Sequence, residues 1–200
     1  MGKAFYQKRV EELFMKSAVV SYASIERIIR DRKKRSDYAK QLIRNLIHKG
    51  TIQPLMKGFY TSRNEASLLV FCLQPAYLGL QDAMSFHQLW EQETVPVVVT
   101  TRCVRQGVRS ALGTNVLVRR IKKEYCFGFE YAAVGDVYLP YSDFEKTFID
   151  MAYFKESLSA EVLQNFKDRV DRKKLKKHLK RYPQRLRDTV WKLLGDVRNT

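Results

Sequence analysis

The chain has 200 residues, 45% of them hydrophobic, so it can fold around one large core or two small ones, which excludes a disordered chain. Its 37 lysines and arginines against 21 aspartates and glutamates give a formal charge of +16, which favours a polyanionic partner such as nucleic acid. Its apolar runs are too short to cross a bilayer and its N-terminus lacks a signal core, which argues against a membrane partner and predicts a cytoplasmic location.

The positive charge is concentrated at the two ends of the chain. Residues 1–62 hold 14 basic and 5 acidic side chains, residues 63–155 hold 10 of each, and residues 156–200 hold 13 and 6. A general solubility bias would not skip the middle of the chain. We therefore predict three parts with these boundaries: a DNA-binding domain, an α+β domain, and a basic amphipathic helical extension that packs on the second domain.

Three helices and a hairpin are predicted in the first part. Apolar residues recur at helical spacings in residues 5–16, 24–30 and 36–50, the last ending at Gly50. Two β-prone runs, 51–55 and 59–61, follow with a glycine between them that suits a tight turn. This order is the outline of a winged helix-turn-helix, in which the third helix enters the major groove of DNA.

The third helix has one apolar and one polar face. Leu42, Ile43, Leu46 and Ile47 share the apolar face, and Gly50 suits the C-terminal end of the helix. The polar face carries donors, acceptors and cations that can reach base edges and phosphates, the basic segment before the helix adds further cations, and the hairpin tip adds one lysine. The predicted DNA-binding residues are Arg32, Lys33, Lys34, Arg35, Ser36 (also the predicted N-cap), Tyr38, Lys40, Gln41, Arg44, Asn45 and Lys57.

The second part reads as a small, mostly antiparallel sheet flanked by helices. Helical patterns cover residues 65–72 and 80–90 before the sheet and 142–154 after it. Ser142 and Glu145 form a capping-box signature at the start of the last helix. The predicted strands are residues 94–101, 115–121, 125–131 and 134–140.

The third part is predicted to form two or three amphipathic helices with a break near Pro183. Basic residues crowd the solvent side of one of them. This cluster could be a second phosphate-contacting surface, a docking surface for an acidic partner, or a solvated face. Its members are Lys173, Lys174, Lys176, Lys177, Lys180 and Arg181.

No motif in the sequence points to catalysis. It lacks a phosphate-binding loop, a zinc-protease motif and a nucleophile elbow, and its three histidines lie far apart. Asp143, Glu145 and Lys146 superficially resemble a nuclease set, but neighbouring side chains on a helix diverge, so a capped helix start is the better interpretation. We therefore predict that the protein is not an enzyme and uses no metal or cofactor.

The three cysteines fit no zinc motif. Cys72, Cys103 and Cys126 are odd in number and widely spaced, so we expect all three to be reduced, small core residues.

Taken in order, these signals resemble the AbiEi family of type IV antitoxins, which are winged-helix transcriptional regulators. The wing GTIQPLMKGFY occupies residues 50–60, the helix YLGLQDAMSFHQLW residues 77–90, and EKTFID residues 145–150, with the β-run VPVVVTT between the last two. The resemblance covers nearly the whole chain. No single motif is stringent, so the shared order and spacing carry it.

The resemblance implies a regulator that binds inverted repeats in its own promoter. Its second domain would oppose a nucleotidyltransferase-like toxin, without necessarily forming a stable complex. Two alternatives stay open: a nuclease or nucleotidyltransferase with an unrecognised site, and an RNA-binding protein, although the exposed aromatic pairs of single-strand readers are missing from the pattern. The sequence also leaves open whether the protein binds DNA as a dimer.

Overall fold

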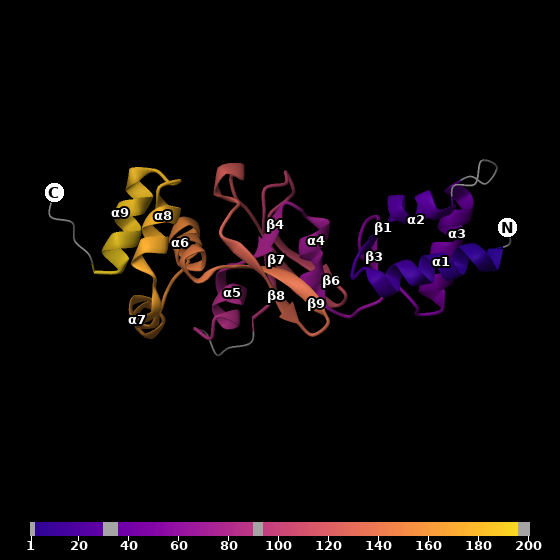
Figure 1. Cartoon of the computed structure of the whole chain (residues 1–200), viewed down its shortest axis with the longest axis horizontal. Coiled ribbons are helices and arrows are strands. Elements are labelled where there is room, and N and C mark those ends of the chain that lie inside the picture. The colour runs from indigo at the N-terminus through magenta and orange to yellow at the C-terminus, as the bar shows by residue number, and fades with distance from the viewer. Residues whose placement is uncertain (1–2, 30–35, 90–93, 196–200) are drawn as a thin grey trace.

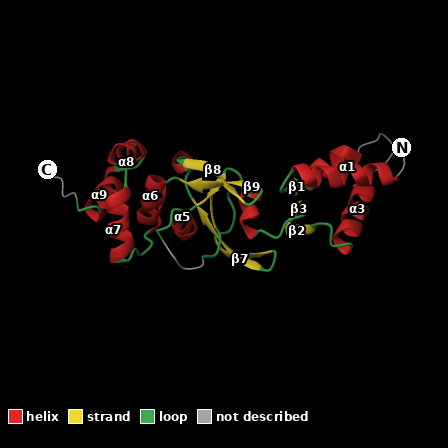
Figure 2. Ribbon diagram, turned by 60° about the horizontal axis from the view of Figure 1, so that its bottom comes forward, coloured by secondary structure: helices red, strands yellow, loops and turns green. Residues whose placement is uncertain are grey.

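The structure is a computed structural model that describes residues 3–29, 36–89 and 94–195. Within these residues the protein is α+β, as predicted, with helices at both ends and a six-stranded sheet in the middle (Figure 1). The N-terminal and C-terminal helices lie at opposite ends of the long axis in both views (Figures 1 and 2). A surface built from the first helices is therefore remote from one built from the last. The proposed boundaries at residues 62 and 155 stay a prediction.

The N-terminal end contains three helices and a three-stranded antiparallel sheet. The helices, all predicted, are α1 (Lys3–Lys16), α2 (Tyr22–Ile29) and α3 (Ser36–His48). The predicted hairpin is also present, and its second strand pairs with a short strand between α1 and α2 that the sequence pattern did not indicate. The strands, in sheet order, are β1 (Val20–Ser21), β3 (Phe59–Thr61) and β2 (Gln53–Met56).

Packing of one face holds α3 in place. Leu42, Ile43 and Leu46 are buried among α1 and α2 residues, and each such side chain stabilises the fold by about 1.5–3 kcal/mol. Ile47, predicted on the same face, is instead 37% exposed near the end of the helix. Because packing rather than intrinsic propensity supplies most of a helix's stability, the outward face of α3 is free for another role.

Two glycines set the turns before and within the hairpin. Gly50 has a φ of +69° and ends α3, where the Thr51 N–H donates to the Leu46 carbonyl at 3.0 Å. Gly58 has a φ of +79° at the hairpin turn, and its carbonyl accepts from the Tyr22 N–H at 2.8 Å. The hairpin is thus joined to the start of α2.

The central sheet has the strand order β6-β7-β5-β4-β9-β8. Three neighbouring pairs are antiparallel, but β4 with β9 and β5 with β7 are parallel, so the prediction of a mostly antiparallel sheet is corrected to a mixed one. Both parallel pairs join strands that are not consecutive, and such partners are chosen by packing rather than by local sequence pattern. The strands are β4 (Ala76–Leu78), β5 (Val97–Thr100), β6 (Gly107–Ala111), β7 (Thr114–Arg120), β8 (Phe129–Val134) and β9 (Val137–Ser142).

Both faces of this sheet are covered, and alternate residues point to opposite faces. Tyr77 and Val99 pack with residues of the C-terminal helices, whereas Leu78 and Val98 pack with α4. The second face also meets Leu55 of the N-terminal hairpin. The helices and 3-10 turns here are η1 (Ala66–Leu68), α4 (Leu69–Cys72), α5 (Leu80–Phe86), η2 (Lys123–Tyr125) and α6 (Phe144–Phe154).

The start of α6 corrects the predicted capping box. Asp143, not Ser142, is the N-cap, and its carboxylate accepts from the Lys146 N–H at 2.8 Å. Glu145 does not reach back to the cap. The helix starts one residue later than the pattern indicated, and the Glu145 carboxylate instead accepts from the Asp171 N–H at 3.0 Å.

Three helices follow, with the predicted break at Pro183, which is the N-cap of the last one. They are α7 (Ala160–Arg169), α8 (Arg172–Leu179) and α9 (Gln184–Leu193). Phe166, Leu175, Leu179 and Val190 are buried in the same apolar cluster as Tyr77. The C-terminal helices and the sheet therefore share one core.

The cysteine prediction is wrong at one position. Cys72 is buried and Cys126 half-buried, but Cys103 is exposed, because it lies in the loop that follows β5 rather than in a strand. Among the residues that the structure describes, no helix has the length and apolar character needed to cross a membrane.

Candidate nucleic-acid interface and a polar cluster

The outward face of α3 carries the central residues of the predicted DNA interface. Lys40, Gln41, Arg44 and Asn45 are all exposed. The Gln41 amide donates to the Asn45 side-chain oxygen at 3.2 Å, one helical turn away, so these two side chains are oriented together. Tyr38 is half-buried and lies edge-on to the Tyr6 ring at 6.3 Å, which places part of this predicted contact in the packing against α1.

The remaining predicted contacts lie around this helix or outside the described part. Lys57 is exposed at the hairpin turn, as predicted. Arg32, Lys33, Lys34 and Arg35 lie outside the described residues, and Ser36 begins α3 without a described side chain.

The side chains of the predicted basic cluster do not all point to solvent. Lys173, Lys176, Lys177, Lys180 and Arg181 are exposed, at the end of the molecule opposite α3 (Figure 1). The Arg181 guanidinium lies 4.2 Å from the Phe127 ring centre, so it also covers part of the core. These exposed residues keep the three interpretations that the sequence left open.

Lys174 is the exception, because it turns toward the sheet. Its ammonium lies 3.3 Å from the Asp143 carboxylate, 3.2 Å from that of Glu145 and 3.7 Å from that of Glu130. Burial would lower the pKa of Lys174, but the carboxylates of Asp143 and Glu145 raise it above the ordinary lysine value. The prediction that Lys174 belongs to the solvent side of the helix is therefore wrong.

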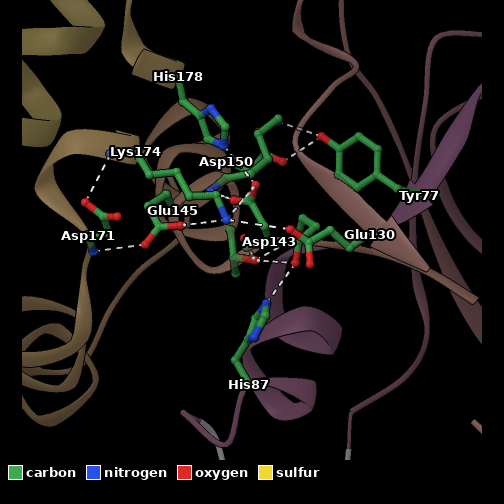
Figure 3. Close-up of polar contacts among 12 residues, drawn as sticks. Tyr77, His87, Glu130, Asp143, Glu145, Asp150, Asp171, Lys174 and His178 are labelled. Atoms are coloured by element: carbon green, nitrogen blue, oxygen red, sulfur yellow. Dashed lines mark hydrogen bonds and ion pairs between the residues drawn. The ribbon is translucent and has the colours of Figure 1, made fainter. Parts of the chain in front are cut away.

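Asp143 is the centre of a polar cluster that joins α6 to α8. The structure places His178 Nε2 2.8 Å from its carboxylate, and Figure 3 shows His178 and Lys174 reaching toward it from the C-terminal helices. Burial alone would raise the pKa of Asp143, but the hydrogen bonds from His178 and the Lys146 N–H hold it below the usual range. The carboxylate is thus charged and fully partnered.

A second, sealed group lies one helical turn further along α6. Lys146 and Asp150 form an ion pair with both side chains 0% exposed. The Tyr77 hydroxyl donates to the second Asp150 oxygen at 2.6 Å and accepts from the Lys146 ammonium at 2.7 Å. Burial lowers the pKa of Lys146 and raises that of Asp150, while the pairing opposes both shifts.

These groups are arranged to hold elements together. The trio of Tyr77, Lys146 and Asp150 is closed to solvent and attaches α6 to β4. Within the described ranges, no three His, Cys, Asp or Glu side chains converge as metal ligands do. The interpretation of Asp143 and Lys146 as a capped helix start therefore describes what these residues do here.

Sequence reasoning missed the partners of this cluster. His178 lies 35 residues from Asp143 and Tyr77 lies 73 residues from Asp150. The only local signal was the four-residue spacing of Lys146 and Asp150, which suits an ion pair on a helix. His87, also missed, directs its Nε2 to the Ser142 carbonyl at 2.8 Å, and burial lowers its pKa.

The fold and these sites define an α+β protein with an open polar helix at one end and a closed ionic cluster toward the other. The sequence matches no protein-family model and no curated protein. Among solved structures, the RV2827C protein from Mycobacterium tuberculosis is similar, with a TM-score of 0.59 and 16% identity, over 96% of this chain and 76% of that one. At this identity the likeness shows a shared fold along nearly the whole chain.

Proposed function

We propose that the protein is a DNA-binding transcriptional regulator of the AbiEi antitoxin type. In this proposal α1, α2, α3 and the β1-β3-β2 sheet form a winged helix, α3 lies in the major groove, and the hairpin with Lys57 follows the backbone. The observation that carries it is the division of α3, whose buried Leu42 and Leu46 leave Gln41, Arg44 and Asn45 exposed.

Chemistry supports base reading by these three side chains. Arg44 can donate two hydrogen bonds to guanine, and Gln41 and Asn45 are the residue types that pair with adenine. Arg44 forms no ion pair with a carboxylate of the described residues, and the uncharged Gln41 and Asn45 side chains are hydrogen-bonded to each other. They are available to a duplex without breaking internal charge pairs.

The regulatory part of the proposal rests on the family resemblance. We infer that the protein binds inverted repeats in its own promoter in the cytoplasm, as a monomer or a dimer, and that the second domain opposes a nucleotidyltransferase-like toxin. The shared fold with the mycobacterial structure supports the architecture. We also propose that the chain acts by binding rather than catalysis, since the buried trio around Lys146 has no access to a substrate.

A footprint of the purified protein on its own upstream region tests the DNA-binding proposal. We expect a protected inverted repeat whose protection by Arg44→Ala requires a protein concentration higher by about ten- to a hundredfold. Equal affinity for the upstream region and a random duplex would contradict it. The antitoxin proposal is tested separately, by co-expression with the product of a neighbouring nucleotidyltransferase-like gene. Rescue of growth is expected, and growth arrest despite full expression of this chain would contradict that part.

A further inference from the structure

The electrically neutral middle of the chain contains a strongly basic region. Residues 102–123 include seven lysines and arginines and no acidic residue, whereas residues 129–142 include Glu130 and Asp136 and no basic residue. The sheet order places β6 at one edge and β8 at the other. The sheet therefore has a basic edge and an acidic edge, which a charge count over the whole segment hides.

Four arginines of the basic edge gather around the loop between β5 and β6. The Arg102 guanidinium donates to the Cys72 carbonyl at 2.9 Å, and Arg109 donates to the Arg105 carbonyl at 2.6 Å. The Arg120 guanidinium lies 3.7 Å from the Cys103 sulfur. These contacts use neutral acceptors, so the charges are held in place but not neutralised.

The arginines of this region differ in whether they are ion-paired. Arg119 points to the opposite face of the sheet and forms an ion pair with Glu156 at 2.7 Å. By contrast, Arg102, Arg105, Arg109 and Arg120 form no ion pair with any carboxylate of the described residues. Arginines with free donors in a fixed arrangement suit phosphate oxygens, which they can bind with two parallel hydrogen bonds.

The loop between β5 and β6 lies on the side of the sheet that faces the N-terminal hairpin and helices. Val104, between Arg102 and Arg105, packs in the same apolar cluster as Leu55 and Met56 of the N-terminal hairpin. Figure 1 shows β6 on the side of the central sheet that faces the N-terminal helices. The arginine loop and the hairpin are thus anchored in one core, which keeps their relative position fixed.

We propose that Arg102, Arg105, Arg109 and Arg120 form a second contact to the phosphate backbone of the duplex that α3 reads. This inference rests on the proposed DNA binding and adds a site to it. Duplex DNA is favoured over single-stranded nucleic acid because Val108 is the only large apolar side chain exposed in this region, so no aromatic platform for stacking bases is present among its described residues. The two carboxylates of the β8 edge are already in ion pairs, Glu130 with Lys174 and Asp136 with Arg63.

Two arginines can be changed with little risk to the fold. Within the described structure the Arg105 side chain makes no hydrogen bond or ion pair, and the only hydrogen-bond partner of the Arg120 side chain is the Cys103 sulfur. We expect Arg105→Gln with Arg120→Gln to weaken binding to the upstream duplex and to a random duplex alike, and to reduce the slope of log affinity against log salt by about two. The matched control, Arg185→Gln with Lys192→Gln, removes two exposed charges from α9 and should leave the slope unchanged.

Cys103 provides a second measurement on the unaltered protein. Alkylation by N-ethylmaleimide, followed by peptide mass spectrometry, should be slowed several-fold at Cys103 by saturating duplex DNA, with half-buried Cys126 as the internal reference. Duplex binding with no protection of Cys103 and an unchanged salt slope in the double variant would overturn this inference and leave the α3 proposal intact. Protection by RNA but not by DNA would also overturn it. Wild-type protein that binds no duplex would overturn both.

Discussion

The imidazole of His178, on the basic helix α8, lies 2.8 Å from the Asp143 carboxylate that caps the start of α6. Lys174, one turn earlier on α8, adds its charge to the same carboxylate at 3.3 Å. The C-terminal helices are therefore joined to α6 and the central sheet by charge as well as by their shared apolar core.

This relationship makes stability depend on acid. Because the pKa of Asp143 is lower in the folded protein than the value of about 3.9 in an unfolded chain, its charge stabilises the fold above that pH and the contribution is lost as the pH falls through the folded value. We expect Asp143→Asn, which keeps a good N-cap, to lower the free energy of unfolding at pH 7 by about 1–3 kcal/mol and to flatten its decline below about pH 4. Urea unfolding across pH 3–7 measures both.

The control for this experiment is Asp168→Asn on the exposed side of α7. Asp168 accepts a hydrogen bond from Gln164 at 2.8 Å but has no cationic partner in the described structure, so its effect should stay within about 0.5 kcal/mol. If the free energy of unfolding fell identically with decreasing pH in wild type and Asp143→Asn, the polar cluster around Asp143 would contribute nothing to stability.

The buried pair in α6 predicts a large effect of removing one partner. Lys146→Met leaves Asp150 sealed from solvent without its counter-charge, which should cost about 3–5 kcal/mol. Adding Asp150→Leu should recover part of this loss, because the remaining buried charge is then gone. Thermal or urea unfolding of the two variants measures the coupling, with Lys173→Met on the exposed side of α8 as the control. If Lys146→Met were as stable as wild type, the buried ion pair of Lys146 and Asp150 would not stabilise the fold.

Base reading by α3 predicts losses of specificity rather than of binding in general. Arg44→Ala, Gln41→Ala and Asn45→Ala should each weaken binding to the upstream operator by about 1–3 kcal/mol. Because the Gln41 amide donates to Asn45, Gln41→Ala combined with Asn45→Ala should lose less binding free energy than the sum of the two single losses. Gln164→Ala, which removes an equivalent amide contact on α7, is the matched control. Titration against operator and random duplexes separates the two kinds of loss.

The hairpin tip predicts the opposite behaviour. Lys57 is exposed at the turn, where a phosphate contact carries no base information, so Lys57→Ala should weaken all duplexes equally and reduce the salt slope by about one. The sequence predicts the same kind of change when Arg32 to Arg35 are neutralised. An unchanged slope in both variants would mean that these cations do not lie at phosphates.

Local sequence patterns were sufficient to predict most of the elements. The spacing of Leu42 and Leu46 indicated α3, Gly50 and Gly58 indicated where the chain turns, and Pro183 indicated the last break. Each of these signals depends on residues within a few positions of one another. The strands β4 and β6 escaped prediction because β4 has three residues and β6 contains glycine, arginine and serine at a sheet edge.

What the sequence by itself determined about this protein is the kind of element at most positions, the polar face of α3 and the excess of positive charge at the two ends. Only the tertiary structure decided which charges remain available. Lys174 turned inward to Asp143, whereas Arg105 and Arg120 stayed unpaired in a segment whose net charge is zero. The physical reason is that periodicity acts over neighbouring residues, while ion pairing, burial and strand partnership join residues tens of positions apart and exist only once the chain has packed.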